Sequence, residues 1–455
     1  MDTKKLRQKI LDLAIHGKLV PQDPTDEPAS VLLERIRAEK ERLIKEGKIK
    51  KSKASKTSDT PHYENVPFEV PDGWGWTTVE NICSKIGSGS TPKGSNYAPD
   101  GILFFRSQNV YNDGVVLEDI KYISEEVHQS MIGTEVLPND LLLNITGGSL
   151  GRCAIVPNEI DRGNVSQHVC ILRPIIIKPE YLHTFILSSF FTKTMKITGS
   201  GREGLPKYNL EKMLLPVPPL EEQTRIIHEL NKWNDWVIAI DNNQQDLVET
   251  IKQTKSKILD LAIHGKLVPQ DENDESASEL LKRINPNAEI TCDNGHYQNL
   301  PGSWCVAPMG MLCSLSDGEK QTGVERINLD VKYLRGERDA KTLTAGKFTP
   351  ANSLLILVDG ENSGEVFRTP IEGYQGSTFK RLSIKDDMNT DYVLQVINLH
   401  RKILRENKVG SAIPHLNKKL FKEIEVPIPP YKEQQRIVEA INLAFKHLDT
   451  IMESL

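Results

Sequence analysis

The sequence lacks most of the signals that would assign a catalytic centre or a membrane span. Its six cysteines never occur as C-x-x-C and have no histidines at zinc-ligand spacing. We therefore expect a reduced, cytoplasmic protein without a metal site, in which cysteine acts as a small apolar residue. No apolar run approaches the ~18–20 residues of a membrane helix, so we expect no membrane association. The net charge of −5 excludes binding of nucleic acid through overall charge and leaves only a local surface for it.

Motifs of the common enzyme classes are missing as well. The chain has no G-x-x-x-x-G-K-[ST] phosphate loop and no G-x-S-x-G elbow, and Gly87-Ser88-Gly89 is not completed to G-x-G-x-x-G. Asp100, Asp119 and Lys121 imitate the acid-acid-lysine pattern of many nucleases, but such loose matches are common. We expect a chain without catalytic residues or a bound cofactor of its own, and we keep a metal-dependent nuclease at these three residues as an alternative.

What the sequence does contain is an internal repeat. Residues 10–23 and 258–271 both read ILDLAIHGKLVPQD, and fourteen identical residues cannot arise from composition. A second pair joins PVPPLEEQTRI at 216–226 to PIPPYKEQQRI at 427–437. The chain is therefore two copies of one unit.

The stretch from Pro219 to Gly265 carries apolar residues at alternating spacings of four and three, which predicts one long helix with a heptad seam. Pro218 and Pro219 suit its start and Gly265 its C-terminal cap. A long helix with a single apolar stripe needs a partner helix. The seam positions of this helix are Ile226, Leu230, Trp233, Val237, Ile240, Leu247, Ile251, Ile258 and Leu261.

The two ends of the chain supply that partner. The C-terminal segment copies the front of the central helix, and the N-terminal segment copies its back. Their seam positions are Leu6, Ile10 and Leu13 at the N-terminus, and Ile437, Ile441, Leu448 and Ile451 at the C-terminus. We expect the ends to rebuild a second long helix, cut between Leu455 and Met1, that packs antiparallel to the first in a circular, pseudo-twofold arrangement. The alternative is that these segments are ordinary core helices.

Between the helices lie two modules rich in short apolar runs broken by Gly, Pro, Asn and Asp. Strands are predicted at residues 102–105, 141–143, 169–172 and 353–358, and helices at 179–198 and 389–408. The fold class is therefore α/β, with two mixed modules separated by a pair of long antiparallel coiled-coil helices. The predicted parts are an N-terminal helix and boundary segment (1–36), a basic linker (37–64), module 1 (65–215), the central long helix with its boundary segment (216–284), module 2 (285–425) and a C-terminal helix (426–455).

Polar loops are the candidate binding surface, because Gln and Asn can bond an adenine edge and Arg a guanine edge. Each loop alone is an ordinary turn more often than a binding site. Only their accumulation on a two-module chain favours base reading. The candidates in module 1 are Lys85, Ser88, Ser90, Thr91, Lys93, Asn96, Tyr97, Arg106, Ser107, Gln108, Asn109, Thr146, Ser149, Arg152, Gln167 and His168. Those in module 2 are Lys320, Gln321, Thr322, Arg335, Arg338, Asn362, Ser363, Gln375, Ser377, Thr378 and Lys380.

These features resemble the DNA-specificity subunits of type I restriction–modification systems over nearly the whole chain. The resemblance rests on the P-x-P-P-x-x-E-Q-x-R-I helix openings at 216–226 and 427–437 and on the D-L-A-I-H-G-K-L-V-P-Q boundaries at 12–22 and 260–270. In module 1, Ser88-Gly89-Ser90-Thr91-Pro92 also looks like the family pattern, whereas residues 316–323 of module 2 read SDGEKQTG.

The resemblance implies a non-catalytic subunit in which each module binds one half of a bipartite, asymmetric site on double-stranded DNA. The helices would fix the spacing of the two halves. It also implies two methyltransferase subunits and two motor-endonuclease subunits as partners. S-adenosylmethionine, ATP and Mg²⁺ would belong to those partners. A coiled-coil interaction scaffold that binds no DNA is the remaining alternative.

Overall fold

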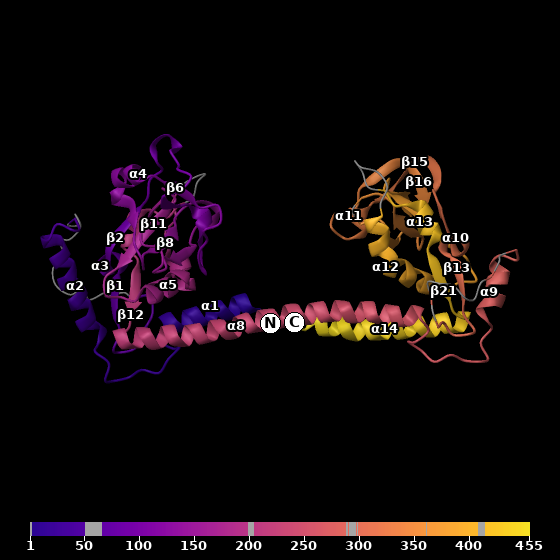
Figure 1. The fold of residues 1–455 in the computed structure, drawn as a ribbon, viewed down its shortest axis with the longest axis horizontal. Helices are drawn as coiled ribbons and strands as arrows, with labels where there is room; N and C mark the ends of the chain where they lie inside the picture. Colours follow the sequence, from indigo (N-terminus) through magenta and orange to yellow (C-terminus); the bar gives the residue numbers. More distant parts are fainter. Residues whose placement is uncertain are drawn as a thin grey trace. The chain divides into compact units, whose positions relative to one another are not determined.

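The computed structural model describes residues 2–50, 66–198, 204–287, 290, 297, 299–360, 362–407 and 415–455. It divides into two compact units, residues 1–243 and residues 244–455, which Figure 1 draws. Each unit contains helices from the repeated segments and one mixed α/β module, as the sequence predicted.

Unit 1 holds two helices ahead of its module. The helices of this unit are α1 (Thr3–Ile15), α2 (Ala29–Lys45), α3 (Val79–Ile82), α4 (Glu125–Ser130), α5 (Pro179–Leu187), α6 (Ser189–Thr194) and α7 (Lys207–Glu211). The 3-10 turns are η1 (Lys93–Ser95), η2 (Ser107–Asn109), η3 (Ile132–Thr134) and η4 (Gly147–Ser149). The strands are β1 (Gly75–Thr78), β2 (Cys83–Ser88), β3 (Ile102–Phe105), β4 (Val110–Tyr111), β5 (Gly114–Val115), β6 (Lys121–Ile123), β7 (Glu135–Val136), β8 (Leu141–Asn144), β9 (Cys153–Ile155), β10 (Gly163–Val165), β11 (Val169–Pro174) and β12 (Leu214–Val217).

Two four-stranded sheets form module 1, with strand orders β2-β11-β8-β9 and β6-β3-β10-β7. The first sheet is antiparallel, and the second contains one parallel pair, β3 with β10. The apolar runs predicted as strands are β3, β8 and β11, and their buried side chains form the module core. β1 and β12 pair with each other, so the first and last strands of the module return to one place beside the helices.

The long helix α8 (Leu220–Ile263) begins in unit 1 and ends in unit 2, directly after Pro219 as predicted. The other helices of unit 2 are α9 (Ala277–Ile284), α10 (Met309–Leu312), α11 (Val331–Leu334), α12 (Thr390–Glu406), α13 (Lys418–Glu423) and α14 (Tyr431–Glu453). Its strands are β13 (Cys305–Pro308), β14 (Cys313–Ser316), β15 (Glu319–Leu329), β16 (Thr342–Thr349), β17 (Leu354–Leu357), β18 (Val366–Arg368), β19 (Gly373–Gln375), β20 (Phe379–Ile384) and β21 (Glu425–Ile428). They form the sheet β14-β20-β17-β18, the pair β13-β21 and a small closed barrel of β15, β16 and β19.

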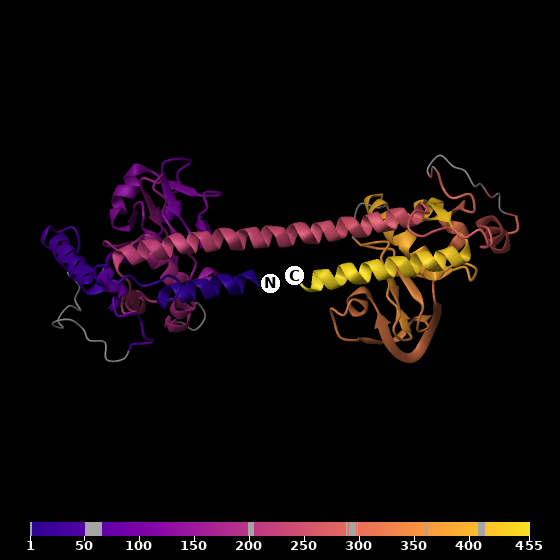
Figure 2. The ribbon, with the colours of Figure 1, turned by 90° about the horizontal axis from the view of Figure 1, so that it is seen from below.

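Each terminal helix packs antiparallel to its own part of α8 (Figure 2). In unit 1 the side chain of Arg7 donates to Asn234 (2.6 Å) and to Asp241 (3.2 Å). In unit 2 the contacts advance along α14 while they move back from the segment after α8 into α8 itself. They are Gln270 Nε2 to Glu433 Oε1 (2.7 Å), Lys255 Nζ to Asp449 Oδ1 (2.5 Å) and Gln244 Nε2 to the Leu455 carbonyl (2.8 Å). The predicted meeting of Leu455 with Met1 involves a residue outside the described part of the chain and stays a prediction.

Two seam positions predicted from the heptad pattern are wrong. Leu247 on α8 is 37% exposed and Ile451 on α14 is 44% exposed, while their neighbours Val248 and Met452 are half-buried. A straight α-helix has 3.6 residues per turn and drifts about 20° per heptad from a 3.5 repeat, so the buried stripe moves on by one residue. The other seam residues are buried or half-buried.

The prediction of one continuous helix at 179–198 is also wrong. Ser188 has an extended backbone and divides the segment into α5 and α6, because its hydroxyl accepts a hydrogen bond from the Phe191 amide (3.3 Å) and caps the second helix. At 389–408 the prediction is confirmed by α12. Residues 37–45 of the predicted linker continue α2, and residues 51–64 lie outside the described residues.

The repeated boundary segment ends α1 and α8 in the same way. Gly17 and Gly265 each have φ +66°, and the next amide donates back to the helix, Lys18 to the Leu13 carbonyl (2.9 Å) in the first copy. A Cβ at either glycine would lie 2.4 Å from a proline ring carbon, at Pro71 in unit 1 and at its counterpart in unit 2. Glycine is therefore required there both for its backbone conformation and for its lack of a side chain.

Next to this cap, a set of polar contacts that we call the module joint fastens the module to α8. Trp74 Nε1 donates to Glu222 Oε2 (2.9 Å), Gln22 Nε2 donates to Glu222 Oε1 (2.8 Å), and Arg225 pairs with Asp26 (2.5 Å). Burial raises the pKa of Glu222. Unit 2 repeats every contact with Trp304, Glu433, Gln270, Arg436 and Asp274.

Candidate functional site

Four polar loops predicted separately from the sequence lie together in module 1. Gly89 and Ser90 donate from their amides to the carbonyls of Val169 (3.1 Å) and Val165 (3.2 Å), which places the loop after β2 against the turn between β10 and β11. The backbone carbonyl of His168 in that turn accepts from the Ile145 amide (3.0 Å), next to the loop that follows β8. We call this set of loops, residues 88–97, 106–109, 146–152 and 166–168, loop cluster 1.

The fourth loop joins through a buried amide. Asn144 Nδ2 donates to the Ser107 carbonyl (2.9 Å), so the turn after β3 lies beside the end of β8. The close approach of the loop after β2 to the turn between β10 and β11 depends on Gly89, because a Cβ there would lie 1.8 Å from the Val165 carbonyl oxygen. The cluster is thus held by backbone contacts and by the Asn144 side chain, and many of its own side chains remain exposed.

Many predicted residues of loop cluster 1 are exposed and carry uncharged hydrogen-bonding groups. His168 Nδ1 and Thr146 Oγ1 lie 2.8 Å apart, and the amide nitrogen of Gln167 lies 3.4 Å from His168 Nε2, which fixes the ring between a hydroxyl and an amide. The Arg152 guanidinium stacks 4.9 Å from the ring centroid of Tyr111. The exposed predicted residues are Ser88, Ser90, Thr91, Lys93, Asn96, Tyr97, Gln108 and Gln167, and the half-buried ones include Ser107, Thr146, Ser149, Arg152 and His168.

Three predicted residues of module 1 are committed to the fold instead. Asn109 is buried; its Oδ1 accepts from the Arg106 amide (3.1 Å) and its Nδ2 donates to the Val116 carbonyl (3.0 Å). Lys85 is half-buried and donates to the Glu135 carbonyl (2.8 Å), and burial lowers its pKa. The Arg106 side chain is half-buried and donates to a loop carbonyl. The prediction that Asn109 contacts a ligand is wrong, because both ends of its amide are used internally.

Unit 2 repeats two of the backbone contacts of this region. The Val358 amide donates to the Thr378 carbonyl (2.9 Å), as Ile145 does to His168, and Gly364 donates to Leu357 (2.7 Å) as Gly151 does to Asn144. We call residues 317–322, 359, 360, 362–364 and 376–378 loop cluster 2. Its exposed or half-buried predicted residues are Lys320, Gln321, Thr322, Asn362, Ser377 and Thr378.

The side chains of loop cluster 2 differ in chemistry from those of loop cluster 1. Asp317 accepts hydrogen bonds from Lys347 (2.8 Å) and Lys380 (2.6 Å), which lower its pKa to about 2. Asp359 Oδ1 lies 2.6 Å from His415 Nδ1, where the first cluster has a threonine–histidine contact. The two clusters therefore present different groups on matching frameworks.

Several predictions in module 2 are corrected. Ser363 is fully buried, and Gln375 is buried with its amide bonded to Gly318 and Phe379. Neither side chain is available to a ligand. Arg335 and Arg338 lie against carboxylates of their own unit, Arg335 against Glu365 and Arg338 against Asp330, and Lys380 is paired with Asp317 as above.

The sequence also failed to predict the element that carries Lys320, Gln321 and Thr322. They lie in the first half of β15, which pairs with β16 over Glu319–Thr322 and again at Arg326 and Ile327. The sequence feature that indicated a different structure here was the departure of residues 316–323 from the loop pattern of module 1.

The structure gives no support to the nuclease alternative. Asp119 offers its backbone carbonyl to Arg106 and has φ +53°, and Lys121 lies exposed in β6. Over the described ranges, no group of three or more His, Cys, Asp or Glu side chains is placed to hold a metal ion. No described helix combines the length and apolar character needed to cross a bilayer.

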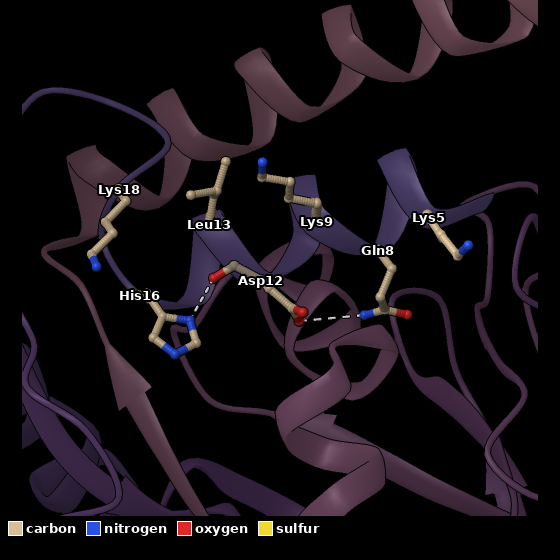
Figure 3. A pocket seen from close by; sticks show the side chains of 7 residues that line it. All are labelled: Lys5, Gln8, Lys9, Asp12, Leu13, His16 and Lys18. Carbon is tan, nitrogen blue, oxygen red and sulfur yellow. Dashed lines mark hydrogen bonds between the residues drawn. The ribbon is translucent and has the colours of Figure 1, made fainter. Parts of the chain in front are cut away.

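A shallow groove lies along α1, and a second lies at the repeat-equivalent place on α8. Figure 3 shows the first, with Asp12 bonded to Gln8 (3.3 Å) on its floor. Lys9 and Asp12 correspond in the repeat to Lys257 and Asp260. The first groove is lined by Lys5, Gln8, Lys9, Asp12, Leu13, His16 and Lys18, and the second by Glu249, Lys252, Gln253, Ser256, Lys257 and Asp260.

Comparison with known proteins gives consistent matches over most of the chain. A family model described as "Type I restriction modification DNA specificity domain" matches residues 71–250 and 326–453. The type I restriction enzyme EcoEI specificity subunit of Escherichia coli is 33% identical over 554 residues, covering 99% of this chain and 90% of that protein. The EcoAI specificity subunit of Escherichia coli is 34% identical over 335 residues, covering 62% of this chain and 55% of that protein, so the chain spans about half the length of that relative.

Two solved structures share the fold. A chain from a study of assembly and conformational transition in a type I R-M system has a TM-score of 0.57 at 18% identity, covering 85% of this chain and 94% of that chain. The HsdS subunit from Thermoanaerobacter tengcongensis has a TM-score of 0.52 at 17% identity, covering 85% and 93%. At these identities the likeness shows the fold alone.

Proposed function

The chain belongs to the family of type I restriction–modification specificity subunits, which recognise DNA sequence, and we propose that each of its modules reads one half of a bipartite, asymmetric DNA site. The observation that carries this proposal is the repeated loop scaffold. Loop cluster 1 and loop cluster 2 share backbone hydrogen bonds but differ in side chains. Backbone contacts repeated in both units support two related docking surfaces for a duplex, and unequal side chains support two different half-sites.

Base reading in unit 1 would come from amide and hydroxyl groups. Side-chain amides of Asn and Gln form paired hydrogen bonds with the edge of adenine in the major groove. Asn96, Gln108 and Gln167 are exposed in loop cluster 1, and His168 is oriented by Thr146. Loop cluster 2 offers Ser377, Thr378 and Asn362, which form a different set of donors and acceptors.

Phosphate binding must be local, because the whole chain is acidic. Lys93 is an exposed cation in loop cluster 1, and Lys320 is one in loop cluster 2. Phosphate contacts set position and salt dependence without choosing a sequence. We therefore assign these lysines to orientation of the modules, and the polar groups to specificity.

The repeat-equivalent grooves on α1 and α8 support two copies of one partner. Identical partners require equivalent surfaces, and Lys9 with Asp12 and Lys257 with Asp260 supply them. We propose that these grooves dock two methyltransferase subunits, and that two motor-endonuclease subunits join for cleavage. The same proposal leaves this chain without catalysis, assigns S-adenosylmethionine, ATP and Mg²⁺ to the partners, and places the assembly in the cytoplasm with the DNA.

A charge reversal in one groove at a time tests the stoichiometry. Lys9→Glu should reduce the methyltransferase subunits per assembled complex from two to one in native mass spectrometry, and Lys257→Glu should do the same. The double variant should lose both. Retention of two copies in the double variant would refute docking at these grooves and leave DNA reading untouched.

Exchange of one module tests the main proposal. Residues 66–215 are replaced by the equivalent module of another specificity subunit, and methylated sites are mapped in DNA exposed to the assembled complex. One half-site should change while the other half and its spacing stay the same. The matched control replaces residues 299–425 and should change only the opposite half. An unchanged target after both exchanges would contradict the assignment of half-sites to modules.

We also propose that α8, which belongs partly to each unit, sets the number of base pairs between the half-sites. Insertion of whole heptads within residues 242–248 should lengthen the preferred spacer and preserve both half-site sequences. A preferred spacer that does not change with helix length would contradict this role.

A further inference from the structure

Unit 2 carries a β-ribbon where unit 1 has a loop. The segment of unit 1 between β2 and β3, residues 89–101, contains only η1. In unit 2, β15 and β16 pair antiparallel with the register Lys320 to Lys347 and Thr322 to Ala345. The register then shifts, because residues 323–325 oppose a single residue of β16, and this bulge bends the ribbon. Figure 2 shows β15 as a curved strand at the rim of unit 2.

Tyr374 holds the curved ribbon from beneath. It is fully buried, and its ring lies under Gly346, where a Cβ would come within 2.6 Å of the ring. Its hydroxyl donates to the Val324 carbonyl inside the bulge (2.7 Å). The Arg326 guanidinium stacks 4.5 Å from the centroid of Phe348 on the same side. The ribbon is therefore a fixed shape whose inner face is occupied.

The outer face is polar, with apolar side chains at the bend. Lys320 and Thr322 are exposed and lie on one face because strand residues alternate. Lys320 has no ion pair among the residues that the structure describes. At the bend, Val324 is 45% exposed and Leu343 is 42% exposed. Of the four basic side chains in residues 319–326 and 341–347, Lys347 is paired with Asp317 and Arg326 with Glu372, and Lys320 and Lys341 are exposed.

The ribbon and loop cluster 2 share residues 319–322. Asp317 and Gly318 precede β15 without a break, and Asp317 binds Lys347 of β16 and Lys380 of β20. A duplex bound at loop cluster 2 would therefore meet the ribbon as part of the same surface. Because this surface is continuous with the loops proposed to bind DNA, its expected occupant is the same duplex.

Resting on the proposed function, we propose that the ribbon of β15 and β16 enters the major groove and reads part of the half-site of unit 2. The major groove of B-DNA admits a two-stranded β-ribbon. Lys320 contacts a phosphate, Thr322 bonds a base edge, and the exposed Val324 and Leu343 contact thymine methyl groups. Unit 1 reads its half-site through loops, so the two halves of the site are recognised by different structural means.

The test uses the complete complex assembled with its partner subunits. Methylation rates are measured on two DNA libraries, one randomised in the half-site of unit 2 and one in that of unit 1. The variants are the double change Thr322→Ala with Leu343→Ala, and the single change Lys320→Ala. The control is Lys402→Ala, which removes an exposed lysine from α12 of the same unit.

The double variant should lose roughly 5- to 150-fold of its discrimination at one or more positions of the unit 2 half-site and none in the other half. Lys320→Ala should weaken binding to all sequences and reduce the slope of log K against log salt by about 0.9. The control should match the parent. All substituted side chains are exposed, so the variants should unfold at the same temperature as the parent. If the double variant is unstable, the binding and salt dependence of Lys320→Ala test whether the ribbon contacts DNA.

An unchanged preference in the unit 2 half-site, with both half-sites still required, would overturn the role of the ribbon and leave the proposed function standing. Loss of partner subunits without a change of preference would also overturn it and would make the ribbon a protein contact. A parent complex that methylates both libraries without preference would instead refute the proposed function itself.

Discussion

The ion pair of the module joint allows one quantitative test, because the chain contains it twice. Arg225 donates to both oxygens of Asp26, at 3.1 and 2.5 Å, and the Asp26 side chain is only 8% exposed. Hydrogen bonds to charged groups contribute about 1.5–3 kcal/mol, and breaking a fully buried pair costs about 3–5 kcal/mol. The Arg225 side chain is a third exposed, so solvent screens the pair and we expect a coupling energy of about 2 kcal/mol.

The measurement is a double-mutant cycle of Arg225→Ala and Asp26→Asn, followed by scanning calorimetry of the full chain. A change of 1 kcal/mol moves the melting temperature of a 150–250-residue unit by about 2–4 °C, so each single variant should melt about 4–8 °C lower. The cycle of Arg436→Ala and Asp274→Asn provides the matched control and should give the same coupling in unit 2. A coupling energy below about 0.5 kcal/mol in both cycles would refute the reasoning that this ion pair holds the boundary segment on the long helix beside the module.

Three further changes have defined outcomes. Burial raises the pKa of Glu222, so ionisation of this carboxyl opposes folding. The free energy of unfolding should therefore rise as the pH falls from the raised pKa towards the ordinary value of 4.5. Urea titrations at several pH values should show that Glu222→Gln flattens this dependence on pH. Gly17→Ala should lower the free energy of unfolding by more than the ~1–2 kcal/mol cost of a left-handed backbone, because the new Cβ meets a proline ring. Gly47→Ala is the control: its φ is also positive and nothing lies within 4 Å, so it should cost only that amount. Equal losses of stability in the two variants would contradict the packing argument. Thr146→Val removes the partner of His168 and should relax methylation preference in the half-site of unit 1 with no effect on the other half.

The sequence predicted the architecture well because the repeat constrains it. An apolar stripe on α8, matched by stripes at both ends of the chain, is enough to assign the helices and their antiparallel packing. The exact residues of the buried stripe were harder to predict. A pattern counted in heptads places Leu247 inward, whereas the straight helix turns Val248 inward in its place. Residue spacing alone does not reveal how far a helix departs from a supercoil.

The binding surface was predicted less completely, because polarity does not report exposure. Asn109, Ser363 and Gln375 have the composition of a recognition loop, yet the structure buries all three. Their burial depends on backbone groups distant in sequence, such as the Val116 carbonyl for Asn109, which no local pattern specifies. The ribbon was missed for a similar reason, since its shape depends on Tyr374, some fifty residues along the chain from the bulge that it supports.

The duplicated module joint has a consequence for how such chains diversify. The glycine cap, the proline ring and the tryptophan–glutamate bond have the same geometry at both positions, so the mounting of a module does not depend on what the module binds. Any module that carries this tryptophan near its start, and ends in a strand leading to this helix opening, can be attached at either position. A new target can therefore be acquired by transplanting one module, without redesigning the scaffold that receives it.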